Sequence, residues 1–166
     1  MEDIVDWLVQ YIEPDNSILR KQNFNVNIRL YKNNKDYKVL IDAIIAHMKK
    51  ILYLNFNNYL HSPVGISGAN VGIPFNIIIV KDKEIVMINP HIFSYSKEKE
   101  RARGACGSLI GHEPVLVERS TSVVVNYFDC KSLRYLRRSF GGFTAKVIQH
   151  EIDHNNGILL IDREIK

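Results

Sequence analysis

The sequence contains little cysteine and no long hydrophobic run. Only Cys106 and Cys130 occur among 166 residues, which is too few for a disulfide-stabilised scaffold and fits a reducing compartment. The longest apolar runs, at 77–80 and 158–161, are far shorter than the roughly 20 residues that a membrane-spanning helix needs. A disulfide scaffold and a helical membrane protein are therefore excluded from the expected classes.

Targeting signals and strong charge bias are also lacking. The acidic start MEDIVDWLVQ has neither the basic beginning of a secretory signal nor the Arg- and Ser-rich character of a transit peptide, so a cytoplasmic location is expected. The net charge of +4 is compatible with ribosome association, although charge by itself bears on encounter and solubility more than on function. No specific DNA partner is expected.

The length and the hydrophobic pattern predict a single compact domain over 1–166, of α+β class with a mainly antiparallel sheet, because strands are grouped between helices. The expected elements are helices over 4–12, 37–57 and 144–157, a Gly-rich loop over 62–74, and strand pairs 76–80 with 85–89 and 122–128 with 132–139. Asn89-Pro90 is expected to end the second strand. Thr144 is the expected N-cap of the last helix and Gly157 its left-handed C-terminal residue.

The last expected helix carries the motif HEIDH at 150–154. Residues four apart lie on the same face of a helix, so His150 and His154 can bind one ion. Glu151 can reach a water on that ion without being a ligand itself. The spacing therefore predicts two metal ligands and a base, and the competing interpretation is an amphipathic helix with two surface histidines.

A catalytic metal site needs a third protein ligand. The downstream Glu of thermolysin-like proteases would need more chain than follows His154, and the third His of metzincins is replaced by Leu160. Upstream, Cys106 lies in GACGSLIG among small residues that allow close approach of the backbone, whereas Cys130 lies near an expected turn. We favour Cys106 as the ligand, with a small buried core residue as the alternative.

The segment QHEIDHNNG at 149–157, with GFTAKV before it and ILLIDRE after it, resembles the QHExDHLxG motif of the peptide deformylase family. Segments resembling those of the family also occur at 14–21, 88–90 and 117–129, so the likeness covers nearly the whole chain. Two further motifs are degenerate, because PVGISGANVG stands for GxGLAAxQVG and GACGS stands for EGCLS. Asn70 thus replaces Gln, Gly104 replaces Glu and Gly107 replaces Leu, while Cys106 is retained.

The resemblance implies hydrolytic removal of the formyl group from the N-terminal formyl-methionine of nascent polypeptides, with release of formate. It implies one divalent metal held by Cys106, His150 and His154, natively Fe²⁺, although the ligand types also suit Zn²⁺, Ni²⁺ or Co²⁺. Metal-bound hydroxide would attack the formyl carbon while Glu151 acts first as general base and then as general acid.

The same resemblance implies further roles. The side-chain amide of Asn70 and the main-chain N–H of Gly107 would donate to the oxyanion. An apolar pocket for the methionine and a main-chain contact for the substrate are expected at Val64, Gly65, Phe143 and Val147.

Two other interpretations remain open. The substitutions at Asn70, Gly104 and Gly107 are compatible with a catalytically impaired relative that binds formylated or free N-termini. A general metalloprotease is the other alternative, and the missing downstream ligand disfavours it. The basic run KSLRYLRRSF at 131–140 is expected to be a solvated hairpin face, with contact to ribosomal RNA as the competing interpretation.

Overall fold

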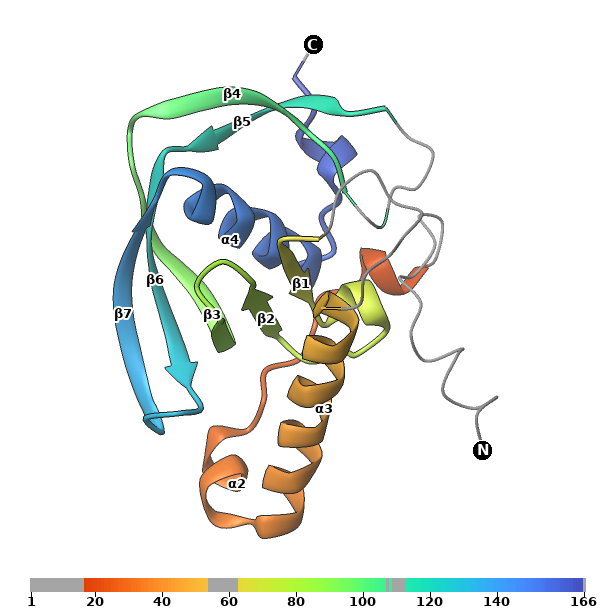
Figure 1. Ribbon diagram of the computed structural model, residues 1–166, viewed down its shortest axis with the longest axis vertical. Coiled ribbons are helices and arrows are strands. Elements are labelled where there is room, and N and C mark those ends of the chain that lie inside the picture. The colour runs from red at the N-terminus through yellow and green to blue at the C-terminus, as the bar shows by residue number, and fades with distance from the viewer. Residues whose placement is uncertain (1–16, 54–62, 107, 109–112, 166) are drawn as a thin grey trace.

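Helices flank a central group of strands in the chain order, as the sequence predicts. The computed structural model describes residues 17–53, 63–106, 108 and 113–165 (Figure 1). The helices are η2 (Ser17–Arg20), α2 (Ile28–Asn33), α3 (Lys35–Tyr53), η3 (Ala69–Val71), α4 (Gly142–Asn155) and η4 (Leu160–Arg163). The strands are β1 (Gly65–Ser67), β2 (Ile77–Val80), β3 (Ile85–Tyr95), β4 (Lys99–Gly104), β5 (Val115–Ser120), β6 (Ser122–Asp129) and β7 (Arg134–Gly141). The α+β class is confirmed, and the helix expected over 4–12 lies outside the described residues.

The described strands form two separate sheets. A five-stranded antiparallel sheet has the order β1-β2-β3-β6-β7, and β4 pairs with β5 in a two-stranded ribbon. Figure 1 shows α4 between the ribbon and the larger sheet. This position lets α4 face two separate layers of strands.

Strand β2 shows how the larger sheet separates two apolar clusters. Successive side chains of a strand point to opposite faces. Ile77 and Ile79 pack in the cluster that contains the buried face of α3, whereas Ile78 and Val80 pack in the cluster that contains α4. All four side chains are buried, and each contributes roughly 1.5–3 kcal/mol relative to exposure. The sheet is thus fixed against a helix on each face.

Helix α3 confirms the expected long helix as far as residue 53. The Asn34 side chain accepts a hydrogen bond from the Tyr37 N–H at 2.9 Å, which caps the first turn. The buried face consists of Ile41, Ile45, Met48, Ile51 and Leu52. In the described ranges no helix is long and apolar enough to cross a membrane.

Strand β3 is longer than predicted, because it continues through Asn89-Pro90 to Tyr95. Its pairing with β6 shifts register between Ile88 and His91, and Asn89 has a positive φ of 52°. Such a bulge leaves one residue unpaired, so Pro90 is tolerated inside the strand. The Asn89 side chain accepts from the Val26 N–H and donates to the Val26 carbonyl, both at 2.8 Å, which stabilises the bulge.

The two ends of α4 differ in how well they match the prediction. The helix begins at Gly142 rather than at a Thr144 cap, because the Thr144 hydroxyl donates to Asp82 at 2.9 Å instead of capping. At the other end Gly157 has φ 74°, and its N–H donates to the His154 carbonyl at 3.0 Å. This left-handed C-terminal turn is the one predicted.

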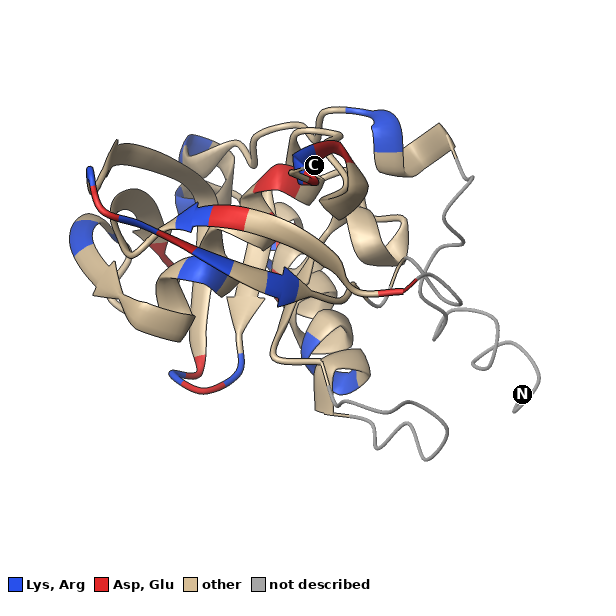
Figure 2. Cartoon of the chain, turned by 90° about the horizontal axis from the view of Figure 1, so that it is seen from above, with Lys and Arg blue, Asp and Glu red and all other residues tan. Residues whose placement is uncertain are grey.

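The stretch at 62–74 and the residues around 100 and 117 contain structure that the sequence did not predict. The expected Gly-rich loop includes β1 and η3. The β4–β5 ribbon lies in segments that are mostly polar, with blue and red residues along both strands in Figure 2. Its importance lies in its position, because β4 leads directly to Cys106.

Candidate metal centre

Helix α4 places two imidazoles on one face. His150 and His154 are four residues apart, their ring centroids are 4.6 Å apart, and the rings are nearly perpendicular at 84°. Their Nε2 atoms lie 3.1 Å from each other. The helical spacing predicted from HEIDH therefore brings two potential ligand atoms to the same point.

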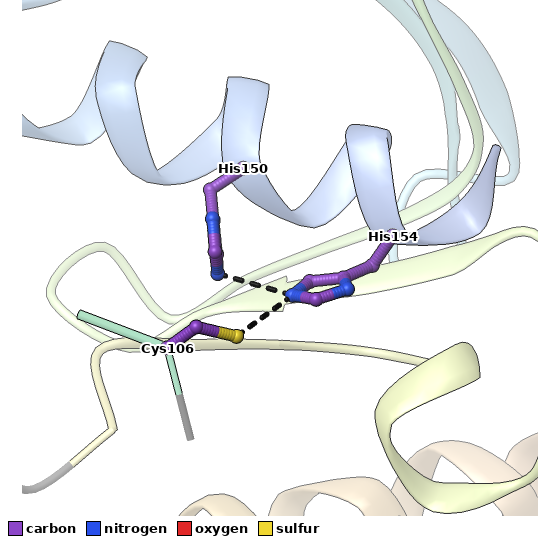
Figure 3. Close-up of side chains that lie close together, drawn as sticks. All are labelled: Cys106, His150 and His154. Atoms are coloured by element: carbon purple, nitrogen blue, oxygen red, sulfur yellow. Dashed lines mark hydrogen bonds between the residues drawn. The ribbon is translucent and has the colours of Figure 1, made fainter. Parts of the chain in front are cut away.

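The third candidate comes from the opposite side of the site. Cys106 follows β4 by two residues, and its sulfur lies 3.1 Å from His154 Nε2 (Figure 3). The sulfur and one ring nitrogen from each of His150 and His154 lie within 4.8 Å of one another. Cys106 and His154 are 48 positions apart in the sequence, yet their side chains belong to one cluster.

The donor set fits a divalent transition metal. Around a tetrahedral ion with metal–nitrogen bonds of about 2.0 Å and a metal–sulfur bond of about 2.3 Å, ligand atoms lie about 3.3–3.6 Å apart. The two distances of 3.1 Å at His154 Nε2 are close to these values. Two imidazoles and one thiol leave a coordination position for a small molecule, which is the arrangement of catalytic sites.

Burial prepares both imidazoles to act as ligands. It lowers the pKa of His154 to about 4 and holds the pKa of His150 well below its ordinary value, and the positive charge of Arg119 lowers both further. Both rings are therefore neutral at physiological pH, and a neutral ring nitrogen can bind a metal without first losing a proton.

Glu151 is a buried carboxyl group beside the two imidazoles in sequence. Only 4% of its surface is exposed, and burial raises its pKa to about 8. Its Oε2 atom has no hydrogen-bond partner among the described residues. A buried and unpartnered carboxyl group of this kind is typical of a functional site, because its burial costs stability unless a ligand or cation compensates.

The β1 strand approaches Glu151 very closely at Gly65. A Cβ atom added there would lie 2.8 Å from Glu151 Oε1 and 2.7 Å from a methyl carbon of Val147. Only glycine therefore allows β1 and α4 to pack at this distance.

Asn70 occupies a buried position near the cysteine segment. Its Oδ1 accepts from the Ser67 N–H at 2.8 Å and from the Ser67 hydroxyl at 2.6 Å. Its Nδ2 donates to the Ser108 hydroxyl at 2.8 Å. Asn70 thus joins the loop after β1 to the residue two positions beyond Cys106, while Gly107 lies outside the described residues.

The residues expected to bind substrate differ in exposure. Val64 and Phe143 are 41% and 61% exposed, whereas Val147 is 7% exposed and belongs to the apolar cluster around α4. Gly65 lies in β1, at one edge of the larger sheet. Val64 thus directly precedes the edge strand β1, which begins at Gly65, and Val147 on α4 lies close to Gly65.

Sequence reasoning missed the polar residues that join α4 to β5. Asp153, inside HEIDH, is buried and forms ion pairs with Arg119 and Arg163. Gln149 is also buried and exchanges hydrogen bonds with the main chain of Ser120 at 2.9 and 3.2 Å. A charged residue on the buried side of a predicted helix is a signal that could have revealed the first of these contacts.

A helix that carries an HExxH motif and faces an upstream cysteine places this protein in the class of candidate metallohydrolases. The model of the family described as polypeptide deformylase matches residues 5–166. The chain belongs to this family. The family is metal-dependent, which agrees with a cluster of side chains that could hold a metal ion.

Individual relatives support the same assignment. A peptide deformylase of Pseudothermotoga lettingae is 32% identical over 137 residues, covering 80% of this chain and 75% of that protein. One of Desulforudis audaxviator is 38% identical over 104 residues, covering 60% of this chain and 66%, just under two thirds, of that protein. The actinonin-bound crystal structure of a class I type b peptide deformylase from Acinetobacter baumannii has a TM-score of 0.74 and 31% identity, covering 93% of this chain and 97% of that one.

Proposed function

We propose that this protein is a peptide deformylase that removes the formyl group from the N-terminal formyl-methionine of nascent polypeptides and releases formate. The observation that carries the proposal is the convergence of Cys106, His150 and His154, with the buried carboxyl group of Glu151 on the residue that follows His150. Family membership over residues 5–166 supports the choice of reaction. The single domain over 1–166 is proposed to act in the cytoplasm.

The proposed metal ligands are Cys106, His150 and His154, with Fe²⁺ as the native ion and Zn²⁺, Ni²⁺ or Co²⁺ as possible substitutes. When bound, such an ion supplies Lewis acidity, which lowers the pKa of water and polarises a carbonyl group. Thiolate and imidazole ligands suit all four ions, so the choice of Fe²⁺ comes from the resemblance to the family.

Glu151 is the proposed proton shuttle. Its raised pKa, about 8, results from burial, and a cation near the carboxylate favours its ionised form. The carboxylate then accepts a proton from the attacking water and delivers it to the departing amine. The close packing against Gly65 restricts the position of the Glu151 carboxyl group.

Asn70 and Gly107 are the proposed donors to the oxyanion. One hydrogen of Asn70 Nδ2 is directed to Ser108, and the second is available for the developing charge. Ser67 fixes the orientation of the amide through two hydrogen bonds to Oδ1.

The substrate is proposed to add to the free edge of β1. Edge strands offer main-chain groups for pairing, and Gly65 lies against Glu151 in the strand at the edge of the described sheet. Val64, Phe143 and Val147 are proposed to contact the methionine side chain. A related Acinetobacter baumannii structure has Met-Ala-Ser bound, which supports a peptide beginning with methionine as the ligand class.

Ribosome association is proposed through the basic β6–β7 hairpin. Arg137 on β7 is exposed and stacks on the Phe93 ring, with its guanidinium carbon 3.8 Å from the ring centroid. Exposed arginine and aromatic side chains together suit contact with RNA. Sedimentation with ribosomes at several salt concentrations would test this part of the proposal.

The experiment that tests the function is formate release from formyl-Met-Ala-Ser by anaerobically prepared, Fe²⁺-loaded protein. We expect turnover, and we expect Glu151→Gln to reduce it by about 10²–10⁴-fold with metal still bound, because a positioned general base contributes that much. A protein that binds metal and formyl peptides but releases no formate would contradict the proposal and favour an impaired relative that binds N-termini.

A further inference from the structure

The buried ion pair between Arg119 and Asp153 lies beside the metal-binding face of α4. The side chains are only 9% and 11% exposed. Arg163 completes the group, because its Nη2 lies 2.7 Å from Asp153 Oδ1 and its Nε lies 3.2 Å from Oδ2. We call Arg119, Asp153 and Arg163 the Asp153 cluster.

The Asp153 cluster joins the two parts of the chain that carry the metal ligands. Asp153 directly precedes His154 on α4. Arg119 lies on β5, which pairs along six positions with β4, and β4 leads into Cys106. A contact between Asp153 and Arg119 therefore determines how far the cysteine-bearing ribbon lies from the histidine-bearing helix.

The geometry of α4 makes this contact specific. At 100° per residue, the row Gln149 and Asp153 is adjacent to the row His150 and His154. Gln149 binds the main chain of Ser120, the residue after Arg119. Two consecutive residues of β5 are thus fixed to two residues of α4 that are one turn apart.

Among the described residues, the ribbon shares no strand pairing with the five-stranded sheet. Its β5 strand is also tied to the C-terminal segment, where Val117 bridges Glu164 and the Ile165 N–H donates to the Leu116 carbonyl at 2.9 Å. β4 has no fully buried side chain, since its residues are exposed or intermediate. Near its other end, Cys106 and Val115 pack against a small cluster that includes Val117 and Leu160. Polar contacts with α4 therefore carry much of the alignment at the Arg119 end.

We propose that Arg119 and Asp153 are positioning residues that set the distance between the Cys106 sulfur and the His150–His154 pair. This inference rests on the proposed metal centre and deepens it. Outer partners of metal ligands commonly change metal affinity by about 10–100-fold when they are lost, because the ligands are no longer held in the bound geometry.

Cobalt binding tests the proposal, because a thiolate bound to Co²⁺ gives a charge-transfer absorption band that an unbound thiol does not. We expect Arg119→Met to weaken Co²⁺ affinity by about 10–100-fold and to reduce the thiolate band at saturating metal. Arg119→Lys keeps the charge without the planar guanidinium and should give an intermediate result.

The matched control is Arg101→Met. Arg101 lies on the same ribbon and pairs with Glu118 at 3.1 Å, but its side chain is 70% exposed. We expect this variant to keep the unchanged protein's affinity and band. An equal loss in Arg101→Met and Arg119→Met would overturn the proposal.

The remaining outcomes are also decisive. A folded Arg119→Met variant with the original affinity and band would overturn the positioning role. If that variant does not fold, Arg119→Lys decides, since an unchanged spectrum and affinity would refute the proposal. Absence of the thiolate band from the unchanged protein would instead refute the metal centre itself.

Discussion

Helix α4 and the segment after β4 bring the proposed metal ligands together, but α4 and the β4–β5 ribbon are held in place by different forces. α4 buries Ala145, Val147, Ile148 and Ile152 in one apolar cluster against the larger sheet. The ribbon buries little on β4 and is tied to α4 by ion pairs and amide hydrogen bonds. We infer that apolar burial contributes more to the order of the histidine half of the site, whereas the cysteine half depends more on polar contacts and on the metal.

Cys106→Ser is the sharpest way to separate the two halves, because it removes the only proposed ligand that the ribbon supplies. We expect metal affinity and formate release to fall by more than about 100-fold, since loss of a ligand exceeds the usual effect of losing an outer partner. Metal titration and a formate assay measure both quantities. Cys130→Ser is the control, because Cys130 is half-buried and packs against the apolar cluster that contains α3. This variant should keep its metal affinity and its formate release. Full activity in Cys106→Ser would contradict the assignment.

Asn70→Ala tests the connection between β1 and the cysteine segment. We expect formate release to fall by about 10²–10³-fold, because one oxyanion donor is lost, with little change in metal affinity. Ser108→Ala removes only the neighbouring hydrogen bond and should cost much less. If the two variants lose activity equally, Asn70 acts by holding the segment in place and not as a donor.

Gly65→Ala disturbs the helix half from the side of β1. The added methyl group would lie 2.8 Å from Glu151 Oε1, so the carboxylate must move. A displacement of about 1 Å can cost on the order of 10²-fold in rate, and we expect a loss of 10–100-fold in kcat with metal affinity unchanged. At Gly104 the nearest atoms would be 3.5 Å from an added Cβ, so Gly104→Ala is a fitting control with near-normal kcat. Equal kcat in both variants would show that Gly65 does not position Glu151.

The stability of the metal-free protein should depend on pH in two directions. Burial raises the pKa of Glu151 from 4.5 to about 8, so its favourable contribution is present below pH 4.5 and is lost as the pH rises through 8. Burial lowers the pKa of His154 from 6.5 to about 4, so its contribution is present above pH 6.5 and is lost as the pH falls through 4. The effect is about 5 kcal/mol for Glu151 and about 3 kcal/mol for His154.

Urea unfolding of metal-free protein between pH 4 and pH 9 measures both changes in the free energy of unfolding. Glu151→Gln should remove the loss of stability above pH 5 and leave the loss at acid pH. If this variant still loses stability as the pH rises, another group is responsible for that loss.

The sequence predicted the helix half of the site well and the ribbon half poorly, for physical reasons. The spacing in HEIDH and the left-handed Gly157 are local signals, and both were confirmed in α4. β4 has the sequence KERARG, which shows no apolar alternation, so its strand was not predicted. The prediction that Asn89-Pro90 ends β3 was wrong, because a bulge accommodates the proline there.

Contacts distant in sequence were beyond local reasoning. Arg119 and Asp153 are 34 positions apart, and neither spacing nor composition indicates that they meet. Cys106 was favoured from its small neighbours, and its place beside His154 depends on the folding of β4 against β5. Local patterns thus pointed to the candidate ligands, whereas the fold determines how their side chains converge.

X-ray absorption spectroscopy of the Zn²⁺-loaded protein tests the central claim most directly. The account predicts one sulfur at about 2.3 Å and two imidazole nitrogens at about 2.0 Å from each ion, with the sulfur signal lost in Cys106→Ser. A spectrum with no sulfur neighbour in the unchanged protein would contradict it.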